Sequence, residues 1–277
     1  MALELDHVEK PLRQMRKLLK SLADDPAPEE VHRLRTRARR IEAAAGALRD
    51  ADEKTTRRLL KAIKPVRRAA GDVRDMDVLT AKLLEMPREA NGEPLVKLVE
   101  HLGTARKASA TKLLDAVDKQ RKPARKLLKD YAAIVASAAS VKKPVQRALA
   151  RTLDADTGSD SAEDQLMDEL ARWPALNYQN LHDFRLKVKE LRYVLQMYPQ
   201  ADARLVSALG HVKDQIGEWH DWEELLRIAR QVLDARTGRE LLERIEASSR
   251  RRLMQALASA NSLRRRFSAA PAARQRA

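Results

Sequence analysis

Apolar side chains recur every three or four positions along most of this chain, and polar side chains fill the positions between them. This spacing is typical of amphipathic helices, because one helical turn takes about 3.6 residues. No segment alternates with the period of two that a half-buried strand requires. The pattern predicts helices over 3–23, 29–49, 53–71, 75–86, 93–135 (broken at Pro123), 141–152, 163–172, 178–198, 201–217, 219–235 and 237–265.

Polar stretches with glycine or proline punctuate this helical pattern. The sequence DDPAPEE at 24–30 offers a capping Asp, prolines for a first turn and early acids, which favour a helix start. Asn177 is placed to cap the helix that carries the second motif described below. The linker DADTGSDSAED at 154–164 is the strongest candidate boundary. We therefore expect a first half over 1–153, a second half over 163–267 and a frayed basic tail over 268–277.

Composition narrows the class of protein. Of the 277 residues, 44% are hydrophobic and 34% are charged, which favours a globular helical protein over a disordered one. No apolar run approaches 18 residues, so no membrane insertion is expected. The N-terminal sequence has no apolar signal core, which favours the cytoplasm. The chain has no cysteine, which excludes disulfides, thiolate catalysis and cysteine-bound metals.

The formal net charge of +15 is unevenly distributed. Residues 1–150 hold 34 Lys and Arg against 21 Asp and Glu, a balance of +13, while residues 151–277 hold 21 against 19, a balance of +2. A field of this strength favours a polyanionic partner such as nucleic acid, an anionic membrane surface or a soluble polyphosphate. Any anion site in the second part must be local.

An internal repeat relates the two parts of the chain. The sequence VHRLRTRARR at 31–40 matches LHDFRLKVKE at 181–190, at an offset of 150. The sequence GDVRDMDVL at 71–79 resembles GEWHDWEEL at 217–225, at an offset of 146. Two related blocks in the same order predict an all-α fold of two pseudo-symmetric helical bundles.

Basic side chains form a stripe beside the apolar face of each repeated helix. Like charges at this spacing repel one another, so an anionic ligand explains the stripes better than a solvated surface does. Further basic residues lie beside the motifs or on neighbouring predicted helices, and a tyrosine hydroxyl is available near the second stripe. Taken alone, the basic stripes over 13–20 and 61–68 also fit a solvated surface. The expected anion-binding set is Arg13, Arg16, Lys17, Lys20, His32, Arg35, Arg37, Arg39, Arg40, Lys64, Arg67, Arg68, Arg74, His182, Arg185, Lys189, Arg192, Tyr193 and Lys213.

Several alternatives stay open at this point. Net charge alone also fits a nucleic-acid-binding protein, although aromatic side chains for base stacking are few. The two His-Asp pairs, at 182–183 and 220–221, fit a metal phosphohydrolase, although a cationic stripe repels a divalent ion. The two leading histidines also fit a structural role. The acids of the glycine blocks are expected to pair with arginine or to lie in the first turn of a helix, rather than to bind metal; they are Asp75, Asp77, Asp221 and Glu223.

The motifs resemble those of the CHAD domain family, the conserved histidine α-helical domain. One family signature, H-x-x-R-x-x-x-R-R, is met by His32, Arg35, Arg39 and Arg40. A second, H-x-[LF]-R-x-x-x-K-x-L-R-Y, is met by residues 182–193, and G-x-x-R-D-x-D-V is met by residues 71–78. The resemblance covers nearly the whole chain. One departure is GEWHDW, where the family more often has an Asn-Asp pair, which leaves the role of His220 open.

The resemblance implies one domain over 1–277 that is built from two four-helix bundles. It also implies a basic groove or pore between the bundles that binds inorganic polyphosphate, and association with polyphosphate granules in the cytoplasm. Other polyanions are possible partners, and nucleic acid is not expected as the specific ligand. Family members are often fused to a triphosphate-hydrolysing domain marked by E-x-E-x-K, a motif missing here. We therefore expect a stand-alone binding protein with no catalytic residue, metal or cofactor.

Overall fold

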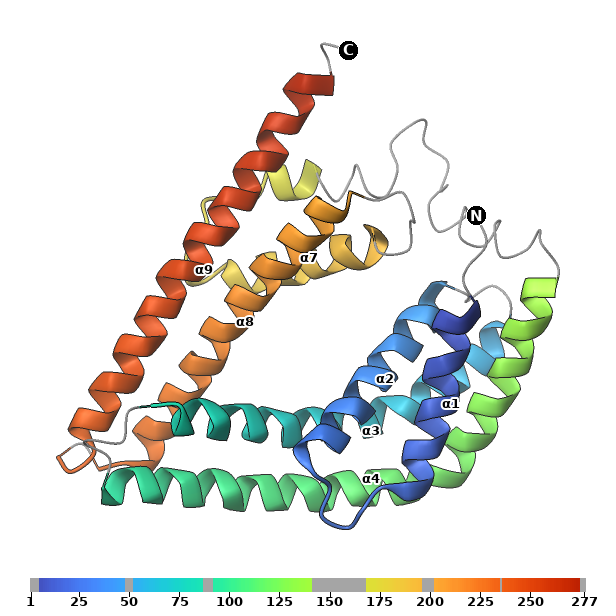
Figure 1. The fold of residues 1–277 in the computed structure, drawn as a ribbon, viewed down its shortest axis with the longest axis horizontal. Helices are drawn as coiled ribbons and strands as arrows, with labels where there is room; N and C mark the ends of the chain where they lie inside the picture. The colour runs from blue at the N-terminus through green and yellow to red at the C-terminus, as the bar shows by residue number, and fades with distance from the viewer. Residues whose placement is uncertain are drawn as a thin grey trace. The chain divides into compact units, whose positions relative to one another are not determined.

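The computed structural model describes residues 5–47, 52–86, 92–140, 168–195, 202–234 and 236–274. All of the regular structure in these ranges is helical, which confirms the all-α prediction (Figure 1). The internal duplication itself stays a prediction. The helices are α1 (Leu5–Ser21), α2 (Pro28–Ala47), α3 (Glu53–Leu84), α4 (Glu93–Ser140), α7 (Leu181–Leu195), α8 (Ala203–Val232) and α9 (Arg239–Arg274).

Three helices run through residues where the sequence predicts an interruption. Helices α3 and α8 continue past Gly71 and Gly217, because one glycine costs a helix only about 1 kcal/mol. Helix α4 continues through Pro123, and its ribbon bends along its length (Figure 1). The predicted breaks at these three positions are therefore wrong.

Two further predictions concern the ends of the described ranges. Helix α9 continues to Arg274, into the segment predicted as a frayed tail from 268. The helix predicted over 141–152 lies outside the described residues. Of the helix predicted over 163–172, only a short helical turn over 168–171 is described.

The chain divides into two compact units. Unit 1 comprises Met1–Ala81 and Val99–Ala155, and unit 2 comprises Lys82–Leu98 and Asp156–Ala277. Unit 1 contains α1, α2 and most of α3 and α4, while unit 2 contains α7, α8 and α9.

Each unit has its own hydrophobic core. Four helices supply the core of unit 1, with Met15, Leu34, Ile63 and Leu128 fully buried on α1, α2, α3 and α4. In unit 2 the core gathers α7, α8 and α9 around Phe184, whose ring meets Trp173 edge-on at 5.6 Å between centroids. Burying a large apolar side chain contributes about 1.5–3 kcal/mol, so these faces hold the helices in register. Across the described part of the chain, no helix is long and apolar enough to cross a membrane.

Candidate functional site

The two histidine-led motifs present the same pattern of burial on α2 and α7. Val31, Leu34 and Ala38 are fully buried on α2, and their counterparts Leu181, Phe184 and Val188 are fully buried on α7. His32 and His182 are exposed, and the arginine three positions after each histidine is half-buried. The predicted apolar faces are therefore confirmed, and the basic stripe borders the core on both helices.

The turns that lead into these helices are also built alike. The Ala27 backbone N–H donates to Glu30 Oε2 at 3.3 Å, and the Asn177 N–H donates to Asn180 Oδ1 at 2.9 Å. Asn177 Oδ1 accepts from the N–H of Gln179 at 2.8 Å, which confirms its predicted capping role. Such caps satisfy backbone donors that a helix start leaves without partners.

The two histidines lie at equivalent positions along the backbone. The N–H of Val31 donates to the Ala27 oxygen at 3.1 Å, and the N–H of Leu181 donates to the Asn177 oxygen at 3.1 Å. His32 and His182 directly follow these two donors.

A glycine lies beneath an arginine of the stripe in each unit. A Cβ atom at Gly71 would lie 3.5 Å from Arg35 Nε, and one at Gly217 would lie 3.1 Å from Arg185 Nη2. A third glycine, Gly210, would bring a Cβ to 3.3 Å from Arg192 Nε. The missing side chains therefore let the guanidinium groups lie against the backbone of α3 and α8. The glycine blocks at 71 and 217 thus serve the histidine-led helices.

In unit 1 these contacts gather cations from two helices, and we call this set the α2–α3 face: His32, Arg35, Arg39, Arg67 and Arg74. Burial is the largest cause that lowers the pKa of the Arg35 guanidinium. Arg39, Arg67 and Arg74 lower it further, whereas Asp75 raises it. Arg67 Nε also donates to Glu42 Oε1 at 2.7 Å. The face therefore holds crowded positive charge that two carboxylates only partly offset.

His32 belongs to this cationic face. Partial desolvation lowers the pKa of the imidazole most, and the positive charges of Arg74 and Arg35 lower it further. The free protein therefore favours the neutral imidazole at neutral pH. A bound anion would oppose the two arginine charges and favour the imidazolium.

Unit 2 carries the counterpart, the α7–α8 face: His182, Arg185, Lys189, Arg192 and Lys213. Arg185 Nε donates to the backbone oxygen of Lys213 at 3.2 Å, which ties α7 to α8. Arg192 Nε is buried and has no hydrogen-bond partner among the described residues. Lys213 Nζ pairs with Asp214 Oδ1 at 2.6 Å. This face therefore also gathers cations from two helices, and a carboxylate pairs with one of them.

Other predicted site residues lie elsewhere. Burial and then the neighbouring Arg40 lower the pKa of Arg37, and the helical repeat places Arg33 with them, away from Arg35 and Arg39. The α7 counterpart of Arg37 is Lys187, which pairs with Glu169 at 3.1 Å. We therefore leave Arg37 and Arg40 outside the α2–α3 face.

The remaining basic residues fall into two groups. Lys64 and Arg68 are exposed on α3 and share the side of that helix that holds Gly71. Arg13, Lys17 and Lys20 are exposed on α1, where Arg16 is half-buried. The side chain of Tyr193 lies outside the described residues.

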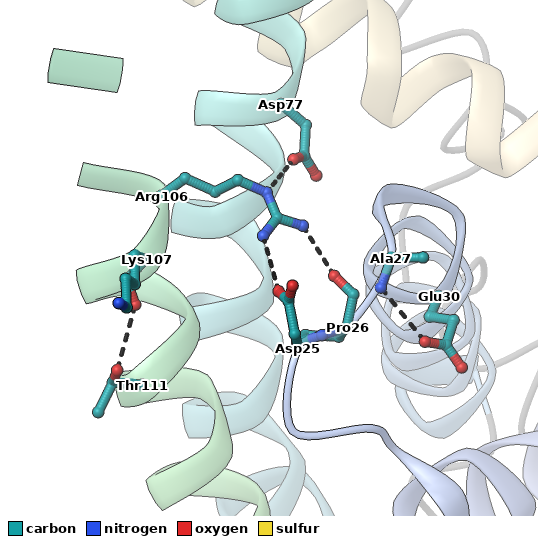
Figure 2. Close-up of polar contacts among 8 residues, drawn as sticks. All are labelled: Asp25, Pro26, Ala27, Glu30, Asp77, Arg106, Lys107 and Thr111. Carbon is teal, nitrogen blue, oxygen red and sulfur yellow. Dashed lines mark hydrogen bonds and ion pairs between the residues drawn. The ribbon is translucent and has the colours of Figure 1, made fainter. Parts of the chain in front are cut away.

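One acid in each unit connects the loop that leads into α2 or α7 to a long helix behind it. In unit 1, Asp77 Oδ1 accepts from Arg106 Nε at 2.7 Å (Figure 2). The same guanidinium donates to the Pro26 carbonyl oxygen at 2.7 Å and to Asp25 Oδ1 at 3.3 Å. Asp77 therefore pairs with arginine, as predicted. Its partner Arg106 was missed, because no motif marks this residue on α4.

In unit 2 the equivalent acid uses neutral partners. Glu223 accepts from the Tyr178 hydroxyl at 3.2 Å and from the Ser249 hydroxyl at 2.9 Å. The predicted arginine partner for Glu223 is therefore wrong, and so is the alternative of a place in a first turn, because α8 begins at Ala203. Tyr178 also packs edge-on against Trp219, at 5.4 Å between ring centroids. Both acids thus brace the loop in front of a histidine-led helix.

Asp221 lies near a buried lysine. Its Oδ2 is 4.0 Å from the buried Nζ of Lys82, which pairs with Glu218 at 2.7 Å. Within the described ranges, no group of three or more His, Asp or Glu side chains is arranged to hold a metal ion.

Comparison with known proteins identifies the class. The family model described as "CHAD domain" matches residues 6–230, so the chain belongs to the CHAD domain family. No curated protein matches the chain. The chain is similar to the crystal structure of the CHAD domain from the plant Ricinus communis, with 18% sequence identity and a TM-score of 0.58. That match covers 94% of this chain and 87% of the plant chain, and it supports the fold alone.

Proposed function

We propose that this protein binds inorganic polyphosphate through the α2–α3 face and the α7–α8 face. The proposal rests on a contact that occurs in both units. A half-buried arginine lies against a glycine, Arg35 against Gly71 and Arg185 against Gly217. Burying a guanidinium and holding it among other cations are both unfavourable in the free protein, and in that order they lower the pKa of Arg35. A polyanion removes this cost, because charge-assisted bonds from arginine to phosphate are strong.

Polyphosphate suits these faces better than nucleic acid does. Its chain carries one charge per unit and has no bases to read, so repeated cations are sufficient for recognition. Aromatic residues make up only 3% of the sequence, and both described tryptophans of α8, Trp219 and Trp222, are buried in unit 2. Few aromatic side chains are therefore available to stack on bases, which is how single-strand binders commonly hold nucleic acid.

The proposed role is binding rather than catalysis, with granule association in the cytoplasm as its cellular consequence. Phosphoryl hydrolysis ordinarily uses a metal ion or a positioned base beside the phosphate. The two faces instead offer permanent cations and histidines. A chain longer than one face gains further affinity by contacting both units at once, because the second contact is intramolecular.

Salt and chain length test the proposal together. Affinity for long-chain polyphosphate should fall steeply with added salt, since each neutralised phosphate releases a counterion and adds about 0.7 to the slope of log K against log salt. Fluorescence titration at several salt concentrations measures this slope. We expect a slope equivalent to at least about five phosphates, and much weaker binding of tripolyphosphate. A slope equivalent to one or two charges, with equal affinity for both ligands, would rule out extended binding.

A further inference from the structure

Two histidines from different helices face each other in unit 2. The rings of His182 on α7 and His220 on α8 lie 5.6 Å apart between centroids and are tilted by 40°. Both side chains are exposed, so a ligand can reach them. His220 does not belong to the basic stripe of α7. It lies in the second glycine block, three residues after Gly217.

Unit 1 has a different residue at the position of His220. Arg74 follows Gly71 by three residues, and its charge is one of the causes that lower the pKa of His32. The equivalent positions therefore hold a histidine and an arginine in unit 1, and two histidines in unit 2. The first pair always contains one cation, whereas the charge of the second pair depends on pH, because imidazoles change charge near neutrality.

Charged groups on both helices surround the histidine pair. For His182, desolvation lowers the pKa most, followed by the charges of His220 and Arg185; Lys189 lowers it further, and Asp183 raises it. From α8, Asp221 and Glu224 follow His220 in sequence. Glu224 accepts from Arg227 at 2.6 and 2.9 Å. This hydrogen bond is the largest cause that lowers the pKa of Glu224, and the charge of His220 lowers it further, so Glu224 also faces the histidine pair.

Two further ionisable groups on this side of unit 2 are bound to each other, and Lys82 lies 4.0 Å from Asp221. Tyr178, in the loop before α7, donates to Glu223, whose charge raises the pKa of the phenol and keeps it protonated. Neither group supplies a cation to the histidine pair. Asp183 and Glu224 compensate a protonated pair in part, and a bound phosphate adds the further negative charge that favours protonation of both rings.

We propose that His182 and His220 form a proton-dependent phosphate site, which makes the α7–α8 face a pH-sensitive contact and leaves the α2–α3 face less sensitive. The inference rests on the proposed function. Protonated imidazoles donate to the non-bridging oxygens of one phosphate group. That phosphate offsets the repulsion between the two rings, so binding takes up protons. Because the two rings interact, the uptake belongs to the pair rather than to either histidine.

The direction in which pH changes the affinity follows from the pKa of His182 in the free protein. The pKa of His182 is lowered there, and a bound polyanion raises it. Affinity should therefore increase as the pH falls from about 8 to about 6, and level off once the free protein is itself protonated. If binding raises a histidine pKa by one unit, the affinity at low pH is about tenfold higher than at high pH.

Exchanging the residues between the two units tests the site. Calorimetric titration with long-chain inorganic polyphosphate, at about pH 6, 7 and 8 and in buffers of different ionisation enthalpy, measures affinity and proton uptake. His220→Arg should bind about tenfold more tightly than wild type at the highest pH and take up fewer protons. Arg74→His should bind more weakly at high pH and take up more protons. Long chains are used because their internal phosphates stay ionised throughout this range.

A charge-matched control on α8 accompanies these variants, and two different results would contradict the histidine site and the proposed function. His211→Arg adds the same charge to the exposed, opposite side of α8 and should leave proton uptake unchanged. Proton uptake equal in wild type, His220→Arg and Arg74→His would overturn the histidine site and leave polyphosphate binding intact. Absence of polyphosphate binding by wild type at every pH would instead overturn the proposed function.

Discussion

Alanine at Arg35, Arg39 and Arg74 is expected to weaken binding of long-chain inorganic polyphosphate about 100-fold, which corresponds to roughly 1 kcal/mol per lost contact. The three side chains belong to one cationic face, as their joint effect on the pKa of Arg35 and His32 indicates. The α7 set Arg185, Lys189 and Arg192 should cost a similar factor when replaced, although unit 2 is less basic.

Charge-matched controls separate a site from a general field. In unit 1, alanine at Arg33, Arg37 and Arg40 removes the same charge from the other side of α2. In unit 2, alanine at Arg239, Arg251 and Arg265 removes it from exposed positions on α9. Each control should cost less than about fivefold. Equal losses for a control and its site triple would mean that only overall charge matters. Far-ultraviolet circular dichroism and melting temperature check the fold, because long side chains also cover apolar surface.

Leucine at Gly217 is expected to weaken polyphosphate binding about tenfold and to lower the melting temperature. A Cβ there already lies 3.1 Å from Arg185 Nη2, so a larger side chain must push the guanidinium off α8 and away from the Lys213 carbonyl. Overpacking of this kind costs about 1–3 kcal/mol. Titration with long-chain polyphosphate and thermal unfolding measure both effects.

Gly103→Leu is the matched control for Gly217→Leu. A Cβ at Gly103 meets nothing within 4 Å, and leucine favours a helix by about 0.8 kcal/mol over glycine. This variant should bind as wild type does and melt at the same temperature or higher. If Gly217→Leu does not fold, Gly217→Ala tests the same contact with a smaller side chain. Wild-type affinity in a folded Gly217 variant would show that the seating of Arg185 is unimportant.

Much of this arrangement can be predicted from local sequence. The apolar positions of α2 and α7 are buried as the helical repeat requires, and Asn177 caps as its residue type suggests. The stripes beside these faces follow from the same repeat, because a helix fixes the direction of each side chain. The family motifs then pair each stripe with its glycine block.

Contacts between helices distant in sequence could not be predicted in this way. Arg106 lies 29 residues from Asp77, and nothing in the sequence of α4 marks it as the partner. An arginine partner or a place in a first helical turn is expected for Glu223 from sequence, but Tyr178 and Ser249 are its partners. The breaks predicted at Gly71, Pro123 and Gly217 failed because packing on both sides of a helix outweighs one unfavourable residue.

Competition between polyphosphate and DNA tests the central claim most directly. Labelled long-chain polyphosphate bound to the wild-type protein is displaced by unlabelled polyphosphate or by double-stranded DNA, at equal phosphate concentration and about 0.15 M salt. Two faces built for a flexible chain of phosphates predict that polyphosphate displaces the label at a concentration at least about tenfold lower than DNA does. Displacement by DNA at an equal or lower phosphate concentration would contradict the account.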